Sequence, residues 1–498
     1  MPSVPTFLRK AMLYLRGPEI YANLTGGPKY ECNLIETIGN LSFNLLRAIA
    51  RIAYCAWPFT AYYLYHKTGR CTDFSVFIFY FQIYSISILT RLFGRLLDKD
   101  YATLVDLLVS VYENPNDDKA KDRVLRTYDI ELLVPLYKKV APSEGLYYPD
   151  LPAKWSWFSP VSWISYVAIH AFGRRMIFPG STLLLNQLVH KTLVDNRYKL
   201  INEDNARRIP VRSADGFTID AIYIKNDGPK TVFVCDGNAG FYEGALWRNF
   251  QLHGNSIIAW NAPGFGASTG KPHSNVEMFN AADAVMKYAM TELNIPPKDI
   301  VIYGWSIGGL TASWLAANYD VHAVLLDATF DSILPLAHKT MPEFAADIVT
   351  YAIGSYFHMP VAEMVARYKG RVAIFRRVYD EIIVTSNDGT DQGRLKSNRA
   401  NFLLETFLKK RYPFVKWTPE DVEYLHRVLA QPSLDSNLVG GPPFSMLTQE
   451  RCATVAGEAR KTMIRRLIHA YFFDVTLGHN AALPYHLCVV PEQYNAPN

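Results

Sequence analysis

The sequence has few cysteines, and they form no recognisable pattern. No two of the six are spaced as CxxC, and they lie scattered at Cys32, Cys55, Cys71, Cys235, Cys452 and Cys488. This distribution argues against a zinc site and against a disulfide framework. We therefore expect thiols that stay reduced, as they do on the cytosolic side of a membrane.

An excess of charge of one sign is also missing. The 51 basic and 46 acidic residues leave a formal net charge of +5, and no basic run contains interleaved aromatic residues. This composition predicts no nucleic-acid partner. The N-terminus lacks a basic segment followed by an apolar stretch and a small-residue cleavage site, so we expect no cleaved signal peptide.

Two apolar stretches occur near the N-terminus, and neither by itself reaches the roughly 20 residues that a bilayer span requires. The first is uncharged from Ile52 to Tyr65 and the second from Phe74 to Thr90. Tyrosine and tryptophan crowd their ends, as at membrane interfaces. We predict a membrane region over residues 1–100 with apolar helices over about 44–65 and 74–93. A buried helical hairpin is the alternative.

Residues 101–205 read as a helical linker with an aromatic tract. Tryptophan, tyrosine and phenylalanine side chains recur through residues 155–178. Such a segment can lie in the membrane interface as an amphipathic helix. Packing of the same aromatic face against a catalytic domain is the alternative interpretation.

Short apolar strands alternate with helical segments over residues 206–490. The strands are expected at residues 231–235, 256–260, 299–303, 323–326 and 372–375. Alternation of this kind predicts an α/β fold, with a mostly parallel central sheet covered by helices on both faces.

The strongest motif is G-x-S-x-G at residues 304–308, between an apolar strand and a helical run. In this context the motif predicts the nucleophile turn of an α/β-hydrolase fold, with Ser306 as the nucleophile. The glycines relieve crowding around a strained backbone, and the following helix directs its N-terminal N–H groups at the developing oxyanion. The sequence therefore predicts a serine hydrolase.

A second turn, at residues 236–240, follows an earlier strand and supplies the other oxyanion donor in this fold. We expect the main-chain N–H groups of Asn238 and Ile307 to form the oxyanion hole. Asp236 stands where many such enzymes have a histidine. An ordinary glycine-asparagine turn is the alternative interpretation.

The serine requires a base and an orienting acid, which follow it along the chain in this fold. Asp380 comes directly after the strand at 372–375, and His479 lies in a Gly-His sequence near the end of the chain. We predict that they complete a catalytic triad that needs no metal and no organic cofactor. The rival acids are Glu381, Asp388 and Asp391, and the rival bases are His426, His469 and His486.

Two inserted segments and one further motif remain. An apolar insertion over about 333–370 predicts a lid above the site, and a helical insertion over about 398–470 separates the acid from the base. His190 and Asp195 have the H-x4-D spacing of glycerolipid acyltransferases. A structural histidine and a helix-exit aspartate are the alternative interpretation of that pair.

Several of these features occur together in one family. They are G-W-S-I-G-G at 304–309, R-R-x-x-D-E-I-I at 376–383, His479 ahead of Pro484, the H-x4-D pair and the paired apolar segments. With them the chain resembles, from about residue 20 to 490, the α/β-hydrolase-domain phosphatidylserine lipases. These are the membrane-bound HLA-B-associated-transcript-type hydrolases.

The resemblance implies hydrolysis of one acyl ester of phosphatidylserine, giving lysophosphatidylserine and a fatty acid, with monoacylglycerol as a further substrate. It implies Ser306 as nucleophile, Asp380 as acid and His479 as base. The expected partners are phospholipids, acylglycerols and an intracellular membrane such as the endoplasmic reticulum, with a cytosolic catalytic domain. Arg376 and Arg377 are candidates for contact with the lipid head group.

Three alternatives stay open. A protein S-acyl thioesterase (depalmitoylase) or a transacylase would use the same triad. A membrane-tethered scaffold would have an inactive hydrolase fold, which the intact order of serine, acid and histidine disfavours. A glycerolipid acyltransferase would use His190 and Asp195 instead of Ser306.

Overall fold

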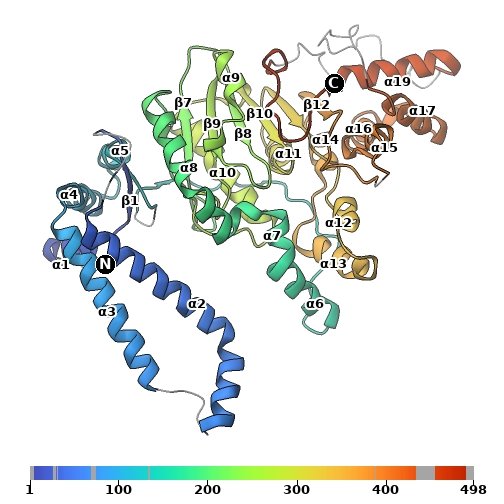
Figure 1. Ribbon diagram of the computed structural model, residues 1–498. Helices are drawn as coiled ribbons and strands as arrows, with labels where there is room; N and C mark the ends of the chain where they lie inside the picture. The colour runs from blue at the N-terminus through green and yellow to red at the C-terminus, as the bar shows by residue number, and fades with distance from the viewer. Residues whose placement is uncertain are drawn as a thin grey trace. The chain divides into compact units, whose positions relative to one another are not determined.

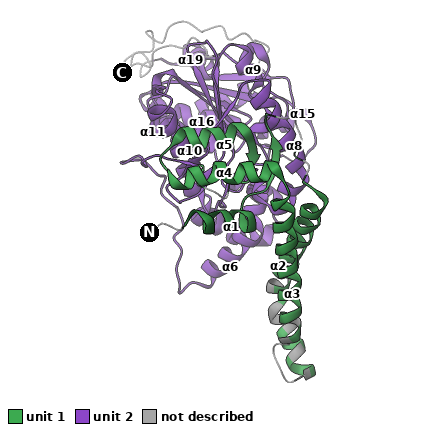
Figure 2. Ribbon diagram, turned by 90° about the vertical axis from the view of Figure 1, so that its left-hand side faces the viewer, with its two compact units in different colours: residues 1–136 green, residues 137–498 purple. Residues whose placement is uncertain are grey.

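The computed structural model describes residues 5–25, 30, 32–68, 74–132, 135–386, 388–432 and 455–489. The chain forms two compact units, residues 1–136 and 137–498 (Figures 1 and 2). The N-terminal unit therefore extends beyond the expected membrane region 1–100. The second unit, residues 137–498, is named the hydrolase unit after its predicted fold. It includes the helices of residues 160–202, which the sequence had placed in a linker.

The N-terminal unit is built around a long helical hairpin. Helices α2 (Leu34–Thr68) and α3 (Phe74–Leu96) run side by side in opposite directions (Figure 1). They approach closely at Gly94, where an added Cβ would lie 2.4 Å from the main-chain nitrogen of Glu36. A larger residue at Gly94 would therefore force the two helices apart.

A buried ion pair closes the base of this hairpin. Arg95 of α3 is completely buried, and its Nε donates to Oε1 of Glu36 at 3.1 Å. Its guanidinium also donates to the carbonyl oxygen of Gly17 at 3.2 Å. The other elements of the unit are α1 (Thr6–Arg16), β1 (Ile20–Asn23), α4 (Lys99–Glu113), α5 (Asp118–Thr127) and β2 (Tyr128–Ile130).

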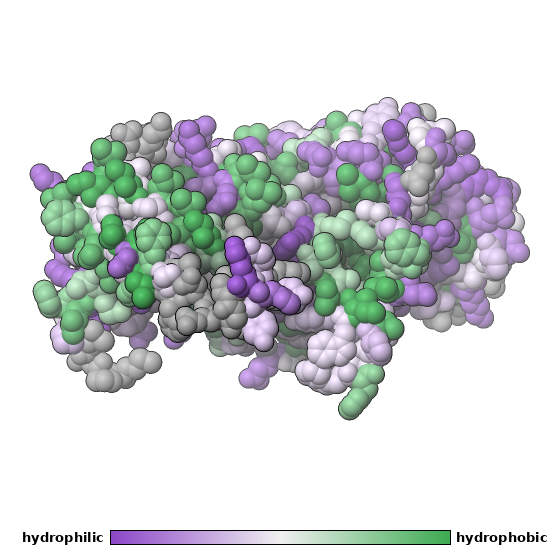
Figure 3. Space-filling model, turned by 60° about the horizontal axis from the view of Figure 1, so that its bottom comes forward, coloured by the Kyte–Doolittle hydropathy of each residue, from purple (hydrophilic) through white to green (hydrophobic). Residues whose placement is uncertain are grey.

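One helical segment in the described part of the chain, Phe77–Leu96, is long and apolar enough to cross a membrane by length and composition. Its side chains face outward to a large extent, with Phe79 and Phe81 63% and 69% exposed. Figure 3 shows hydrophobic side chains gathered over the α2–α3 hairpin. The other apolar stretch, 44–65, lies within α2, and many of its side chains fall outside the described residues.

The hydrolase unit contains an eight-stranded sheet in the order β13-β12-β11-β10-β8-β9-β7-β4. Neighbours from β13 to β9 pair in parallel, and the β9–β7 and β7–β4 pairs are antiparallel. The prediction of a mostly parallel α/β-hydrolase sheet is confirmed. The strands are β4 (Arg207–Arg208), β7 (Ala221–Ile224), β8 (Thr231–Cys235), β9 (Ser256–Trp260), β10 (Ile300–Trp305), β11 (Ala323–Asp327), β12 (Arg371–Arg377) and β13 (Phe472–Val475).

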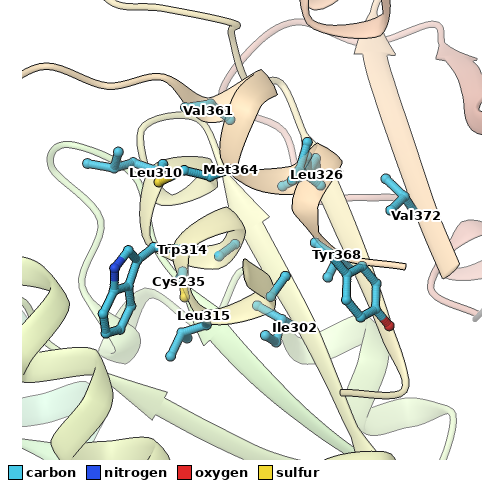
Figure 4. Packing of buried hydrophobic residues seen from close by; sticks show 14 of the residues in the cluster. Cys235, Ile302, Leu310, Trp314, Leu315, Leu326, Val361, Met364, Tyr368 and Val372 are labelled. Carbon is cyan, nitrogen blue, oxygen red and sulfur yellow. The ribbon is translucent and has the colours of Figure 1, made fainter. Parts of the chain in front are cut away.

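Both faces of this sheet are buried. Along β10, Ile300 and Ile302 belong to one apolar cluster, whereas Val301 and Tyr303 belong to the cluster on the other face. Strands with two buried faces read as continuous apolar runs, which is why they were recognisable in the sequence. Figure 4 shows part of the first cluster, in which Trp314 of α11 (Gly308–Asn318) packs among the core residues.

The helices that follow β11 serve two different purposes. α12 (Leu334–Thr340) and α13 (Ala346–Tyr356) lie over the end of the sheet. α14 (Val361–Arg367) instead packs against α11 and α16 (Arg399–Arg411), with most of its residues buried. Only the first part of the expected lid, 333–370, is thus placed to cover a site, because α14 is a core helix.

The helical insertion lies against the last strands of the sheet. α16 and α19 (Gly457–Tyr471) both pack on β12, and α17 (Pro419–Leu429) packs on α16 and α19. They form the crossover that carries the chain from β12 to the parallel strand β13. Residues 433–454 of the expected insertion lie outside the described residues.

Arg376 and Arg377 are structural residues rather than head-group ligands. Arg377 makes two hydrogen bonds with Asp327 of β11, at 2.8 and 2.6 Å. Arg376 makes two with Asp474 of β13, at 2.7 and 2.8 Å. All four side chains are buried, so the paired arginines tie β12 to both of its neighbours and are not exposed to a head group.

Candidate active site

Ser306 occupies a sharp turn between β10 and α11. Its φ of 55° lies in the left-handed region, which a non-glycine residue adopts only where the surrounding structure enforces it. Close packing does so here, because an added Cβ at Gly308 would lie 2.0 Å from the carbonyl oxygen of Cys235. The end of β8 and the start of α11 therefore meet directly beside the serine.

The structure brings Ser306, His479 and Asp380 together. His479 Nε2 lies 2.9 Å from Ser306 Oγ, and His479 Nδ1 lies 2.8 Å from Asp380 Oδ2. All three side chains are buried. An ionised carboxylate only accepts hydrogen bonds, so the imidazole proton lies on Nδ1, and Nε2 is left to accept the serine proton. This geometry is that of a serine nucleophile with its base and orienting acid.

The carboxylate of Asp380 is held from its other side. Its Oδ1 accepts the main-chain N–H groups of Ile382 and Ile383, at 2.8 and 2.9 Å. The rivals lie elsewhere: Asp388 and Asp391 are exposed on the surface, and His426 pairs with Glu405 at 2.7 Å. His469 and His486 are also exposed, on α19 and on the turn Tyr485–Leu487.

Two residues to which the sequence analysis assigned no such role position the histidine loop. The indole Nε1 of Trp305 donates to the carbonyl oxygen of His479 at 3.1 Å. The carboxylate of Glu381 accepts the main-chain N–H of His479 at 3.3 Å. Trp305 stands at a variable position of the G-x-S-x-G pattern and Glu381 was only a rival acid, so no local signal indicated these contacts.

Asn238 and Ile307 both line the pocket that contains Ser306. Ile307 begins the turn into α11, and Asn238 follows the end of β8, which is the neighbour of β10 in the sheet. The two main chains therefore reach the serine from adjacent strands, as an oxyanion hole of this fold requires. Their role as donors stays a prediction.

Asp236, at the same turn, is half-buried, and its Oδ1 atom is enclosed. Its Oδ1 has no hydrogen-bond partner among the described residues. Burial, together with the nearby charge of Glu243, raises the pKa of Asp236 to about 7. The carboxyl is therefore retained in its neutral form up to about neutral pH.

Replacement of Asp236 by asparagine is expected to stabilise the protein at pH 8 more than at pH 5.5. In the unfolded chain this carboxyl ionises near pH 4, whereas in the folded protein it keeps its proton up to about pH 7. The free energy of unfolding therefore falls as the pH rises from 4 to 7. An uncharged asparagine amide avoids this loss of folding free energy, which is on the order of 1–3 kcal/mol at pH 8. Melting temperatures at the two pH values test this, with the exposed Asp320→Asn as control. An equal shift at both would contradict it.

The pocket above Ser306 has a volume of about 610 Å³. Its walls are largely apolar and come from three segments: the helical stretch 168–177, the helices α12 and α13, and the loop after Asp380. The charged side chains that line it are Lys339 and Glu381. A site of this size and lining suits a long apolar chain whose reacting ester lies near polar groups.

The acyltransferase interpretation and a metal site have little support. His190 and Asp195 lie on α8 (Leu183–Asn202), five positions apart and therefore about 140° apart around the helix axis. Neither lines the pocket of Ser306. Among the described residues, no group of three or more histidine, cysteine, aspartate or glutamate side chains could hold a metal ion.

Comparison with known proteins agrees with this architecture. Residues 230–403 match the family model of the alpha/beta hydrolase fold, and residues 9–131 match that of the Phosphatidylserine Lipase ABHD16 N-terminal domain. A Caenorhabditis elegans protein, F37A4.1, is 36% identical over 411 residues, covering 80% of this chain and 84% of its own length. The chain belongs to the ABHD16 family.

Among ABHD16 members, the human and mouse phosphatidylserine lipases ABHD16A are each 41% identical over 263 residues. The matched part covers 51% of this chain and 46% of each lipase, about half their length. The resemblance drawn from the sequence is confirmed, and the predicted fold and serine-hydrolase class agree with it. The N-terminal ABHD16 match ends at residue 131, close to the end of the first compact unit.

Proposed function

We propose that this protein is a membrane-associated serine lipase that hydrolyses an acyl ester of phosphatidylserine to lysophosphatidylserine and a fatty acid. The observation that carries the proposal is the position of Ser306 and its hydrogen-bonded histidine at an apolar pocket of about 610 Å³. The ABHD16A lipases named above support the choice of lipid.

In the proposed mechanism, Ser306 Oγ attacks the ester carbonyl while His479 Nε2 takes its proton. Asp380 holds the imidazole through Nδ1 and stabilises the imidazolium. The oxyanion is bound by the main-chain N–H groups of Asn238 and Ile307. The imidazolium protonates the leaving glycerol oxygen, and water then hydrolyses the acyl-enzyme, with His479 acting again as base.

Lys339 and Glu381 are the groups that we expect near a phosphoserine head group. The head group carries phosphate, carboxylate and ammonium charges, and the pocket offers one side chain of each sign. Lys339 Nζ also donates to the carbonyl oxygen of Val384 at 2.9 Å, which places the ammonium beside the loop that follows Asp380. An uncharged monoacylglycerol would use neither charge.

The test is release of fatty acid by the full-length protein from matched vesicles of phosphatidylserine, phosphatidylcholine, phosphatidylethanolamine and monoacylglycerol, with an S-palmitoylated peptide alongside. Ser306→Ala serves as the blank. A clear preference for phosphatidylserine is expected. Preference for the thioester would make the protein a depalmitoylase, and activity that depends on acyl-CoA and survives in the blank would favour the His190 and Asp195 alternative.

Replacement of Lys339 by alanine is expected to lower kcat/KM for phosphatidylserine about fivefold and to leave monoacylglycerol hydrolysis nearly unchanged. An exposed charge contact is worth roughly 1 kcal/mol. The matched control is Lys298→Ala, a highly exposed lysine that precedes β10, at the opposite end of the strand from Ser306. Equal losses on both lipids would show that Lys339 supports the fold or the lid rather than the head group.

We also propose that the protein resides in an intracellular membrane such as the endoplasmic reticulum, with the hydrolase unit in the cytosol. The segment Phe77–Leu96 supports membrane insertion. Cys235 and Cys488 are buried free thiols, as expected in a reducing compartment. Protease protection of the hydrolase unit in sealed microsomes would contradict this orientation.

A further inference from the structure

Helix α6 (Pro160–Ala168) has the opposite polarity to that of a helix that faces water. The side chains directed into the protein are small and polar: Ser162 and Ser165 are completely buried, and Ser162 Oγ lies 2.7 Å from the hydroxyl of Tyr351 on α13. The outward positions carry large apolar side chains, with 42% to 58% of each exposed: Val161, Trp163, Ile164, Tyr166 and Val167. A water-facing helix shows the reverse arrangement.

The exposed apolar surface continues ahead of the helix. Trp157 is 70% exposed and Phe158 is 98% exposed. The rings of Trp155, Trp157 and Trp163 pack against one another edge to face, with centroids 4.5 to 5.3 Å apart, and so hold the protruding segment in shape. Figure 3 shows hydrophobic side chains gathered over the region of α6 and α13, above a protruding group of large side chains.

Apolar side chains continue from this surface to the pocket of Ser306. Phe172 and Met176 are 69% and 48% exposed, and both also line the pocket. Ala168, at the end of α6, and the next residue, Ile169, line the pocket as well. One continuous helical stretch therefore presents apolar side chains to the outside and forms a wall of the pocket on its other side.

We propose that these outward residues of the hydrolase unit, Trp157, Phe158, Val161, Trp163, Ile164 and Val167, form a rim surface that lies in the interface of a phospholipid bilayer. The acyl chain of a substrate then passes from the bilayer into the pocket without crossing water. This inference rests on the proposed lipid substrate and goes beyond it. It assigns the catalytic unit a membrane contact of its own, separate from the N-terminal hairpin.

Physical chemistry favours a bilayer over a protein partner at this surface. Exposing a long acyl chain to water is unfavourable by about 0.8 kcal/mol per methylene group, so an entrance embedded in the interface avoids a large barrier. A protein seated on the rim surface would instead cover the mouth of the pocket. Tryptophan and tyrosine are the side chains enriched at membrane interfaces. The exposed Lys154 precedes the rim residues and the exposed Arg175 follows them, and both complement an anionic lipid surface.

The test compares bilayer and water-soluble substrates in one preparation of the full-length protein in proteoliposomes. The bilayer contains phosphatidylserine and monoacylglycerol, and the soluble substrate is p-nitrophenyl butyrate. Phe158→Glu and Ile164→Glu place a charge on the rim surface without altering residues that line the pocket. Leu252→Glu, at the end of α9 (Arg248–Leu252), is the matched control, since Leu252 is 64% exposed.

We expect each rim variant to lose at least tenfold in hydrolysis of the bilayer lipids and to stay within about twofold on the soluble ester. The control should change neither. Rim variants that match Leu252→Glu on bilayer lipids would overturn the proposal, and so would equal losses on both kinds of substrate. Wild-type protein that hydrolyses bilayer monoacylglycerol but not phosphatidylserine would contradict the proposed head group and leave the rim comparison intact. If the wild-type protein hydrolyses neither bilayer lipid, the proposed lipase function and the proposed rim surface are both overturned.

Discussion

Replacement of Ser306 by alanine is expected to lower kcat for a soluble ester by roughly 10⁴- to 10⁶-fold. Its Oγ, 2.9 Å from His479 Nε2, is the atom that we propose to form the acyl-enzyme. The fold should survive, because alanine keeps the Cβ and removes one hydroxyl. Release of p-nitrophenol by the purified full-length protein measures the loss.

A fluorophosphonate probe gives an independent readout, because it labels a serine only when a base activates it. Wild type should be labelled at Ser306 and the alanine variant should not. Ser313→Ala is the matched control: Ser313 is buried in α11, and its Oγ has no hydrogen-bond partner among the described residues. Labelling that persists in Ser306→Ala would show that the nucleophile is another residue.

Replacement of Asp380 by asparagine is expected to lower kcat by about 10⁴-fold. The reason is the way the side chain is fixed. Oδ1 accepts two main-chain N–H groups, from Ile382 and Ile383, so an asparagine would keep its oxygen there and direct its NH₂ group at His479. The imidazole would then have to accept at Nδ1 and carry its proton on Nε2, the tautomer that cannot take a proton from Ser306.

This substitution also discriminates between the candidate acids. Asp388→Asn is the control, since the carboxylate of Asp388 is exposed and accepts the N–H of Thr390 at 2.9 Å. The control should retain wild-type kcat, and melting temperatures should show that both variants are folded. A loss of less than tenfold in Asp380→Asn would mean that another carboxylate orients the histidine.

The parts of the fold that the sequence predicted are those set by local pattern. The strands of the sheet have two buried faces and appear as apolar runs, and the turn at Ser306 needs small neighbours at fixed spacing. Asp380 and His479 followed from their order along the chain. The strand and turn signals lie within a few residues of the groups that they identify, whereas the acid and the base were predicted from the order that this fold imposes along the chain.

The parts that the sequence did not predict depend on distant partners. Arg376 and Arg377 were candidates for a head-group site, but their carboxylate partners lie 98 and 50 residues away, which no local pattern reveals. Residues 101–136 were assigned to a linker, although Tyr101 donates its hydroxyl to the carbonyl oxygen of Leu13 and packs in the N-terminal unit. The sequence analysis assigned the apolar helix α14 to the lid. Its burial against α11 and α16 depends on tertiary packing, which the local sequence does not reveal.

The indole of Trp305 has a consequence for how much the length of the intervening chain matters to the site. Trp305 is the residue next to Ser306, and it holds the main chain of His479, 174 positions further on. The turn of Ser306 and the loop of His479 are thus joined by a direct hydrogen bond, in addition to the bond that Asp380 makes with the imidazole. The entropy of closing such a loop grows only slowly with its length. A change in the length of the helices between Asp380 and β13 would therefore leave the hydrogen bond between Trp305 and His479 in place.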